Sequence, residues 1–216
     1  MTQSATADHT FSDPGADPGD GAAGSAPGRA VSLYGSNVEY ALHCLLWLAP
    51  AREAPASSRD LAELTGVSPA LVAKVLPKLE KAGVLEAHGG VAGGYRLAKP
   101  AGEITVLEIV DAVDGGKRLF DCKEVRLKCP LFGADPPTWA SRGVCTIHAV
   151  MLRAEKSMRR EMAQTTLLDI ANAVGVKAPD SFGAEVGGWL DDRIVAREQA
   201  RVAGIRDSAQ RRLQEG

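Results

Sequence analysis

The chain has 216 residues, of which 45% are hydrophobic, and a formal net charge of −2 at pH 7. This length suffices for one core of ordinary size. So small a charge excludes a strongly basic protein whose overall field attracts nucleic acid, and any DNA-binding surface must come from local clustering. The first thirty residues lack the cationic start and apolar stretch of a secretory signal, and no apolar run approaches the roughly 18 residues of a membrane span. We therefore expect a cytoplasmic protein.

Four segments are expected along the chain. Residues 1–30 are rich in Ala, Gly, Pro, Asp and Ser and have almost no apolar anchor, which predicts a disordered leader. Residues 31–116 are predicted to form one domain and residues 117–174 a cysteine segment followed by a long helix. Residues 175–216 are predicted to be a linker and a tail that is helical from Trp189 to Leu213.

The first helix is expected to begin at Ser36, because Ser36 and Glu39 have the spacing of a capping box. From Val38 to Leu48 the sequence is apolar almost all round, which is typical of a helix packed between a core and a partner. Pro50 is expected to end this helix.

A helix-turn-helix is predicted next. Ser58 can cap a short helix, Gly66 suits the left-handed turn that follows, and Ser68 can cap a second helix that closes at Gly83. Two helices joined by so tight a turn define this motif. Pro77 lies inside the second helix and is expected to bend or weaken its last turns.

Residues 84–87 and 95–97 have the pattern of short strands on either side of the glycine-rich segment 88–94. Strands in this position, directly after a helix-turn-helix, predict a wing. A second capping box from Thr105 to Glu108 opens a short helix that ends before Gly115. The expected fold class is mainly α with a small β-wing, namely a winged helix-turn-helix plus a long dimerisation helix.

The long helix carries an apolar stripe. Its members recur at three- and four-residue steps and are Ile147, Met151, Ala154, Met158 and Met162. A helix too long to be covered by a small winged domain favours contact with a second subunit along this stripe. Ordinary packing within one subunit is the alternative.

Three of the four cysteines, Cys122, Cys129 and Cys145, fall in the irregular segment before the long helix. Clustered thiols in the cytoplasm more often indicate metal or redox chemistry than structural disulfides. Their spacing lacks the paired CxxC knuckles of common zinc sites, so it favours another soft metal or an iron–sulfur cluster over structural zinc. Cys44 lies in an apolar helix and is expected to be a buried small hydrophobe.

Several segments in order resemble the Rrf2 family of winged-helix repressors, which includes IscR-type and NsrR-type iron–sulfur regulators. The matching segments are 38–42, 67–85, 93–97, 104–115, 129–131 and 165–167. The resemblance covers about residues 33–174 and is specific in combination, although each segment alone is weak.

The resemblance implies binding to a double-stranded DNA operator by a homodimer. The N-terminal part of the second helix of such a motif lies in the major groove, and the wing follows the backbone or minor groove. The candidates for contact with base edges are Ser68, Ala70, Leu71 and Lys74. The candidates for contact with phosphates are Lys78, His88 and Arg96.

The resemblance also implies that Cys122, Cys129 and Cys145 hold an iron–sulfur cluster, with [2Fe–2S] favoured and [4Fe–4S] the alternative. The fourth ligand is open. It is either Glu39 of the other subunit, with or without His43 four residues further on, or His148, three residues after Cys145.

The expected function is an iron–sulfur-dependent transcription regulator, a repressor, that senses redox state, nitric oxide or cluster status. The alternatives are a cluster-free thiol switch and a winged-helix protein-interaction module with structural zinc. We do not expect an enzyme, because the sequence has no HExxH motif, phosphate-binding loop or nucleophile elbow.

Overall fold

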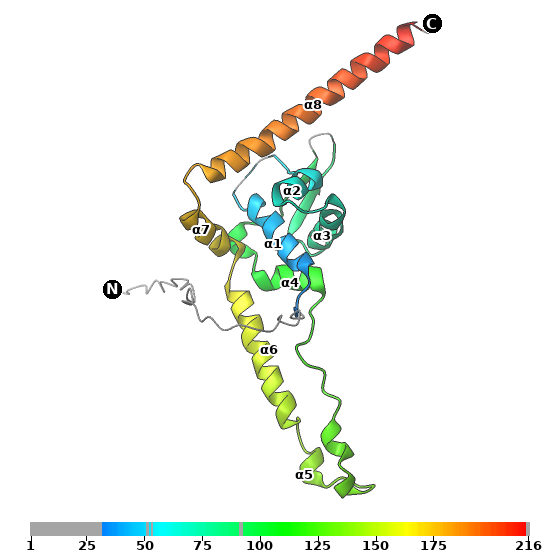
Figure 1. The fold of residues 1–216 in the computed structure, drawn as a ribbon, viewed down its shortest axis with the longest axis vertical. Coiled ribbons are helices and arrows are strands. Elements are labelled where there is room, and N and C mark those ends of the chain that lie inside the picture. The colour runs from blue at the N-terminus through cyan, green and yellow to red at the C-terminus, as the bar shows by residue number, and fades with distance from the viewer. Residues whose placement is uncertain (1–31, 51, 53, 91–92, 215–216) are drawn as a thin grey trace, which may run out of the picture. The chain divides into compact units, whose positions relative to one another are not determined.

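The computed structural model describes residues 32–50, 52, 54–90 and 93–214; the predicted leader 1–30 lies outside them. The helices are α1 Ser36–Leu48, α2 Ser58–Thr65, α3 Pro69–Lys81, α4 Val106–Asp114, α5 Thr138–Ser141, α6 Thr146–Gln164, α7 Leu167–Lys177 and α8 Phe182–Gln214. The strands are β1 Leu85–His88 and β2 Gly94–Leu97, and the short 3-10 turns are η1 Ala101–Glu103, η2 Val125–Lys128 and η3 Pro130–Phe132. The predicted fold class, mainly helical with a small β-wing, is confirmed (Figure 1).

The winged helix-turn-helix is formed by α2, α3 and the two-stranded sheet. Gly66 ends α2 in the left-handed conformation, with φ of 67°, and this allows the chain to turn into α3. β1 and β2 pair antiparallel with Leu85 opposite Leu97. Gly94 is needed where the sheet meets the preceding loop, because a Cβ there would lie 2.3 Å from the carbonyl oxygen of Ala56.

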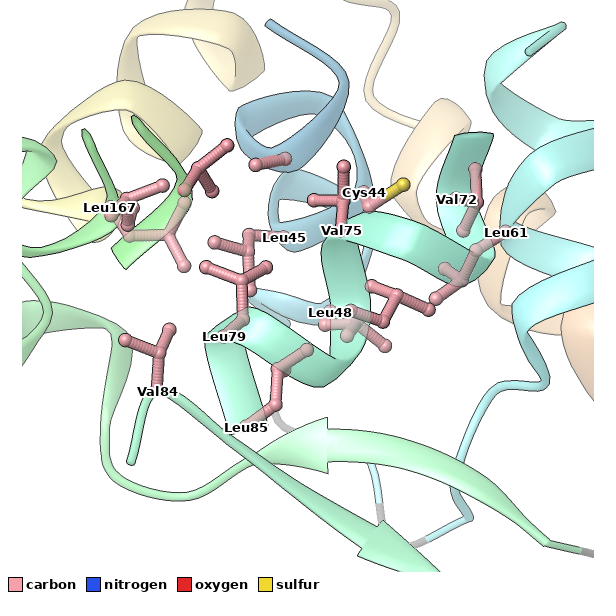
Figure 2. Close-up of a cluster of buried hydrophobic side chains, with 14 of the residues drawn as sticks. Cys44, Leu45, Leu48, Leu61, Val72, Val75, Leu79, Val84, Leu85 and Leu167 are labelled. Atoms are coloured by element: carbon pink, nitrogen blue, oxygen red, sulfur yellow. The ribbon is translucent and has the colours of Figure 1, made fainter. Parts of the chain in front are cut away.

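The core joins α1, α3 and the elements around them. Leu45, Leu76 and Leu79 are fully buried. Leu167 at the start of α7 belongs to the same cluster, and Figure 2 shows it together with Leu45 and Leu79. These residues recur at the spacing that puts one face of each helix inward. As a result the opposite face of α3 is left facing outward.

α1 begins at Ser36 as predicted, but the predicted caps of α1 and α2 are wrong. The N-cap of α1 is Gly35, and neither Ser36 nor Glu39 makes the bonds of a capping box. The N-cap of α2 is Ser57 and not Ser58; its hydroxyl accepts a hydrogen bond from the N–H of Asp60. In α1 the free N–H of Gly35 donates to Asp114 at the end of α4, so a tertiary contact replaces the expected local one.

We expect the Asp114→Ala variant to lose about 1 to 2 kcal/mol of stability at neutral pH, because two charge-assisted hydrogen bonds are removed. The side chain of Asp114 accepts from Lys117 at 2.8 Å and from Gly35 at 3.2 Å, and mainly the Lys117 bond lowers the pKa of its carboxyl. A lowered folded-state pKa means that this contribution is present above the unfolded-state pKa and is lost as the pH falls through the folded-state value. Urea denaturation should therefore show a difference from wild type at pH 7 that shrinks below about pH 4. The exposed Asp135, changed to alanine, is the control and should show little difference at either pH.

Pro77 does not end α3. The helix continues through it to Lys81, with Leu76 and Leu79 on either side buried in the core. Burial of these neighbours stabilises a helix that has lost one backbone donor. The last turns are helical, and the bend or weakening expected at Pro77 stays a prediction.

The long helix α6 has 19 residues, none of which is buried. It is held to α4 by Arg159, which donates to both carboxylate oxygens of Asp111 at 2.9 and 2.7 Å. Ile147, at the start of the predicted stripe, is 68% exposed. The helix therefore presents apolar side chains that this chain does not cover.

Beyond residue 175 the structure differs from the predicted linker. α7 extends to Lys177, and its start has a complete capping box between Thr166 and Asp169. α8 begins at Phe182, seven residues before the predicted start at Trp189, and has 33 residues. Val186 and Leu190 bury against the core, so part of the tail belongs to the folded body. None of the helices described here is both long and apolar enough to cross a membrane.

Candidate nucleic-acid interface and metal centre

The outward face of α3 carries the residues predicted to read bases. Ser68, Ala70 and Lys74 are exposed and Leu71 is half-buried, whereas Val72 on the other face is fully buried. Pro69 occupies the first helical position, where a backbone N–H would have no partner within the helix, so its missing N–H costs no hydrogen bond. Within the described part of the chain Lys74 makes no ion pair, so its ammonium group is available to a ligand.

The three residues predicted to contact phosphates are engaged inside the protein. The amine of Lys78 donates to the carbonyl oxygen of Val113 at 2.7 Å. Glu86 accepts from Arg96 at 2.6 and 3.0 Å and lies 3.1 Å from the ring of His88. These bonds, first that from Arg96, lower the pKa of the Glu86 carboxyl, which is therefore ionised at neutral pH. Each of the three side chains therefore already has a partner within the protein.

Three possible metal ligands converge at the start of α6. The thiol of Cys122, a carboxylate oxygen of Glu124 and a ring nitrogen of His148 all lie within 4.8 Å of one another. Glu124 has a positive φ of 50°, unusual for a residue with a side chain. This backbone turn brings two residues of the cysteine segment to the first turn of α6. Glu124 was not predicted; its place two residues after Cys122 is the only signal in the sequence.

Cys145 is the N-cap of α6, and its side chain is buried. The nearby backbone N–H groups of His148 and Ile147 lower the pKa of its thiol, that of His148 having the larger effect. Helix N-termini stabilise thiolates in this way because their free N–H groups point toward the sulfur. A thiolate is the form that binds iron or zinc.

Cys129 lies between η2 and η3 and is half-buried. It is not part of the group formed by Cys122, Glu124 and His148, and neither is Cys145. The structure thus brings one of the three predicted thiol ligands directly to a predicted histidine ligand.

Glu39 and His43 lie on α1, away from that group within the chain. They are four residues apart, so both project from one face of the helix, and both are exposed. Among the described residues neither side chain makes a hydrogen bond. Cys44 beside them is 1% exposed, and burial raises the pKa of its thiol to about 11, which confirms that it is a neutral core residue.

Residues 34–173 match the sequence profile of the Rrf2 family, described as iron-dependent transcriptional regulators. The Rrf2 protein of Nitratidesulfovibrio vulgaris is 30% identical over 118 residues, which cover 55% of this chain and 72% of that protein. The repressor NsrR of Streptomyces coelicolor is 28% identical over 137 residues, covering 62% and 85%.

Two solved structures show the same fold. They are IscR of T. potens, with a TM-score of 0.50, 22% identity and coverage of 67% of this chain and 89% of that one, and CymR, the global cysteine regulator of B. subtilis, with a TM-score of 0.50, 19% identity and coverage of 66% and 98%.

An exposed recognition helix, a two-stranded wing and a profile match over both define a winged-helix transcriptional regulator. More particularly, the chain belongs to the Rrf2 family, whose members are transcriptional regulators and not enzymes. α8 lies beyond the matched residues.

Proposed function

We propose that this chain is a homodimeric repressor that binds operator DNA through α3 and the wing and responds to an iron–sulfur cluster held by the cysteine segment. The observation that carries the proposal is the convergence of Cys122, Glu124 and His148 within 4.8 Å at the start of α6. A thiolate and an imidazole in one place are ligands suited to iron.

The donor types of the cysteine segment, three thiols and an imidazole, suit such a cluster, and two of these donors, Cys122 and His148, lie together. Cys122, Cys129 and Cys145 supply three thiolates, and the lowered pKa of the Cys145 thiol favours the form that ligates. His148 is the fourth ligand best supported by the geometry, since it already lies beside Cys122. A mixed thiolate and imidazole set favours [2Fe–2S] over [4Fe–4S]. When bound, the cluster supplies a group whose charge and ligation change with oxidation or nitric oxide.

The alternative fourth ligand is Glu39, with or without His43, supplied by the α1 of the partner subunit. Both side chains are exposed and on one helix face, which supports this arrangement. Such a ligand would join the cysteine segment of one subunit directly to the winged domain of the other.

A dimer is supported by α6. Its 19 residues include none that is buried, and the predicted stripe begins at an isoleucine that is 68% exposed. Pairing two such helices would cover apolar surface that costs free energy in water.

The DNA face is supported by the outward positions of Ser68, Ala70, Leu71 and Lys74 on α3. Lys78, His88 and Arg96 are proposed to contact phosphates; Lys78 and Arg96 have more N–H donors than the bonds to Val113 and Glu86 use. Because Glu86 accepts from both wing side chains, it holds them in position in the free protein.

A cluster-free thiol switch is the second candidate, and the lowered pKa of the Cys145 thiol favours it. Oxidation of Cys145 with Cys122 or Cys129 would then carry the signal. A protein-interaction module with structural zinc is the third candidate, and the experiment must distinguish it from the other two.

The test is anaerobic purification of the full chain, followed by metal and sulfide analysis and by selection of bound duplexes from a randomised pool. We expect iron, acid-labile sulfide and visible absorption, and an enriched duplex sequence. Zinc without iron would support the interaction module. No metal, with DNA binding that still depends on oxidation, would support the thiol switch, and no enriched duplex would overturn the proposal.

The contribution of α3 is tested by Lys74→Ala. Loss of one direct contact to DNA is expected to weaken binding to the selected duplex by about tenfold. Lys81→Ala, at the opposite end of the same helix, removes the same charge and is expected to have a much smaller effect.

A further inference from the structure

The last helix of the chain is divided into a docked half and a free half. Val186 and Leu190 in its first half are buried in the core. From Glu198 to Gln214 every residue is exposed. Half of this helix contacts nothing in the described chain. We therefore expect that half to bind another molecule.

The docked half is fixed to α2 by ion pairs. Arg193 pairs with Glu63 and Arg197 pairs with Asp60. Asp60 is only 4% exposed and also accepts a hydrogen bond from the hydroxyl of Ser57 at 2.7 Å. Asp60 is therefore held in place, and it holds Arg197 in turn. These contacts set where α8 leaves the body of the protein.

The arginines that dock α8 belong to a stripe that continues into the free half. Arg193, Arg197 and Arg201 follow at four-residue steps and therefore share one face. Further along this face the residues are first small, Gly204 and Ser208, and then basic again, Arg211 and Arg212. We call residues 198–214 the basic arm; it carries four arginines against Glu198 and Asp207, a formal charge of +2.

The arm begins where operator DNA is expected to pass. In a helix-turn-helix the first helix crosses the DNA backbone while the second enters the major groove. α2 is that first helix, and α8 leaves from its side (Figure 1). At 1.5 Å per residue the arm reaches about 25 Å, the length of roughly seven base pairs. Arginines on an exposed helix suit phosphate oxygens and need no particular base sequence.

We infer that the basic arm is a second DNA contact, which binds the phosphate backbone of the duplex flanking the site read by α3. The inference rests on the proposed DNA binding and adds to it a sequence-independent contribution. A second copy of this chain is the competing partner, because Val202, Ile205 and Leu213 are exposed on another face of the arm.

The test is a triple variant of the full chain, Arg201→Gln, Arg211→Gln and Arg212→Gln. Glutamine keeps the helical propensity while the charge is removed. Affinity for the selected duplex, extended by about ten base pairs on each side, is measured against salt concentration. Each phosphate contact contributes about 0.9 to the slope of log K against log salt, so we expect the slope to fall by about 2 to 3 for each arm that binds, or about 5 for the two arms of a dimer. On the duplex trimmed to the α3 sites, wild type and variant should bind alike.

The matched control removes the same charge from α6. Arg153→Gln, Lys156→Gln and Arg160→Gln change exposed residues on the face of α6 opposite the apolar stripe, and the slope should stay close to wild type. If the wild type binds the duplex but the slope of the arm variant is unchanged, the inferred DNA contact of the arm is wrong and the proposed function stands. A variant that loses its dimer in sedimentation assigns the arm to a second copy and also overturns the inference. If the wild-type chain binds no duplex, both the proposed function and the inferred DNA contact of the arm are wrong.

Discussion

Changing Cys122 to serine is expected to remove nearly all iron from the anaerobically purified protein and to abolish any change of DNA affinity on exposure to air. Cys122 is the thiol that lies with Glu124 and His148 within 4.8 Å. A serine hydroxyl stays protonated at neutral pH and is a poor ligand for iron, so the site loses a donor that its neighbours cannot replace. Iron per chain should fall to about a tenth of wild type or less.

The control for this variant is Cys44→Ala, which changes a buried thiol that has no part in the site. It should keep its iron and its visible absorption. Cys122→Ser protein that still binds iron and still responds to air would contradict the proposed ligands.

His148→Ala and Glu39→Ala, made in the same series, separate the two proposals for the fourth ligand. The geometry favours loss of iron in the first and retention in the second. The reverse result would place the ligand on α1 of the partner subunit, and His43→Ala would then show whether one or two of its side chains take part.

The second large effect is expected in the core beneath the recognition helix. Leu79→Ala should lower the free energy of unfolding by about 2 to 5 kcal/mol, since Leu79 is fully buried and a cavity would remain. Urea denaturation at fixed protein concentration measures the loss, because the stability of the proposed dimer would depend on concentration. Leu213→Ala, at a residue 83% exposed, is the control and should change stability by less than about 0.5 kcal/mol. Equal midpoints for the two variants would contradict the assigned core.

The winged helix-turn-helix could be predicted because its signals are local. The turn at Gly66 needs a left-handed residue, and the apolar residues of α3 recur at the period of a helix. The cap of α1 could not be predicted in the same way. Ser36 and Glu39 have the spacing of a capping box, but Asp114, 79 residues from Gly35, provides the bond instead. Sequence patterns carry no information about contacts over such separations.

The same limit applies to the site and to α8. Spacing identified Cys122, Cys129 and Cys145 as a group, but it could not say that Cys122 meets His148 first or that Glu124 joins them. The turn that brings them together depends on the positive φ of Glu124. No sequence pattern predicts this conformation for a glutamate. The docking of α8 depends on Asp60, whose partner Arg197 is 137 residues away.

Three elements hold α4 within four residues of one another. α6 binds it at Asp111 through Arg159, α3 binds it at Val113 through Lys78, and the start of α1 binds it at Asp114 through Gly35. α6, which begins at the cysteine segment, and the recognition helix α3 therefore both contact the same short helix, α4. Because packed helices shift as units and do not stretch, a displacement of α6 at Arg159 would be transmitted as a tilt of α4 to the spacing of the two recognition helices in a dimer.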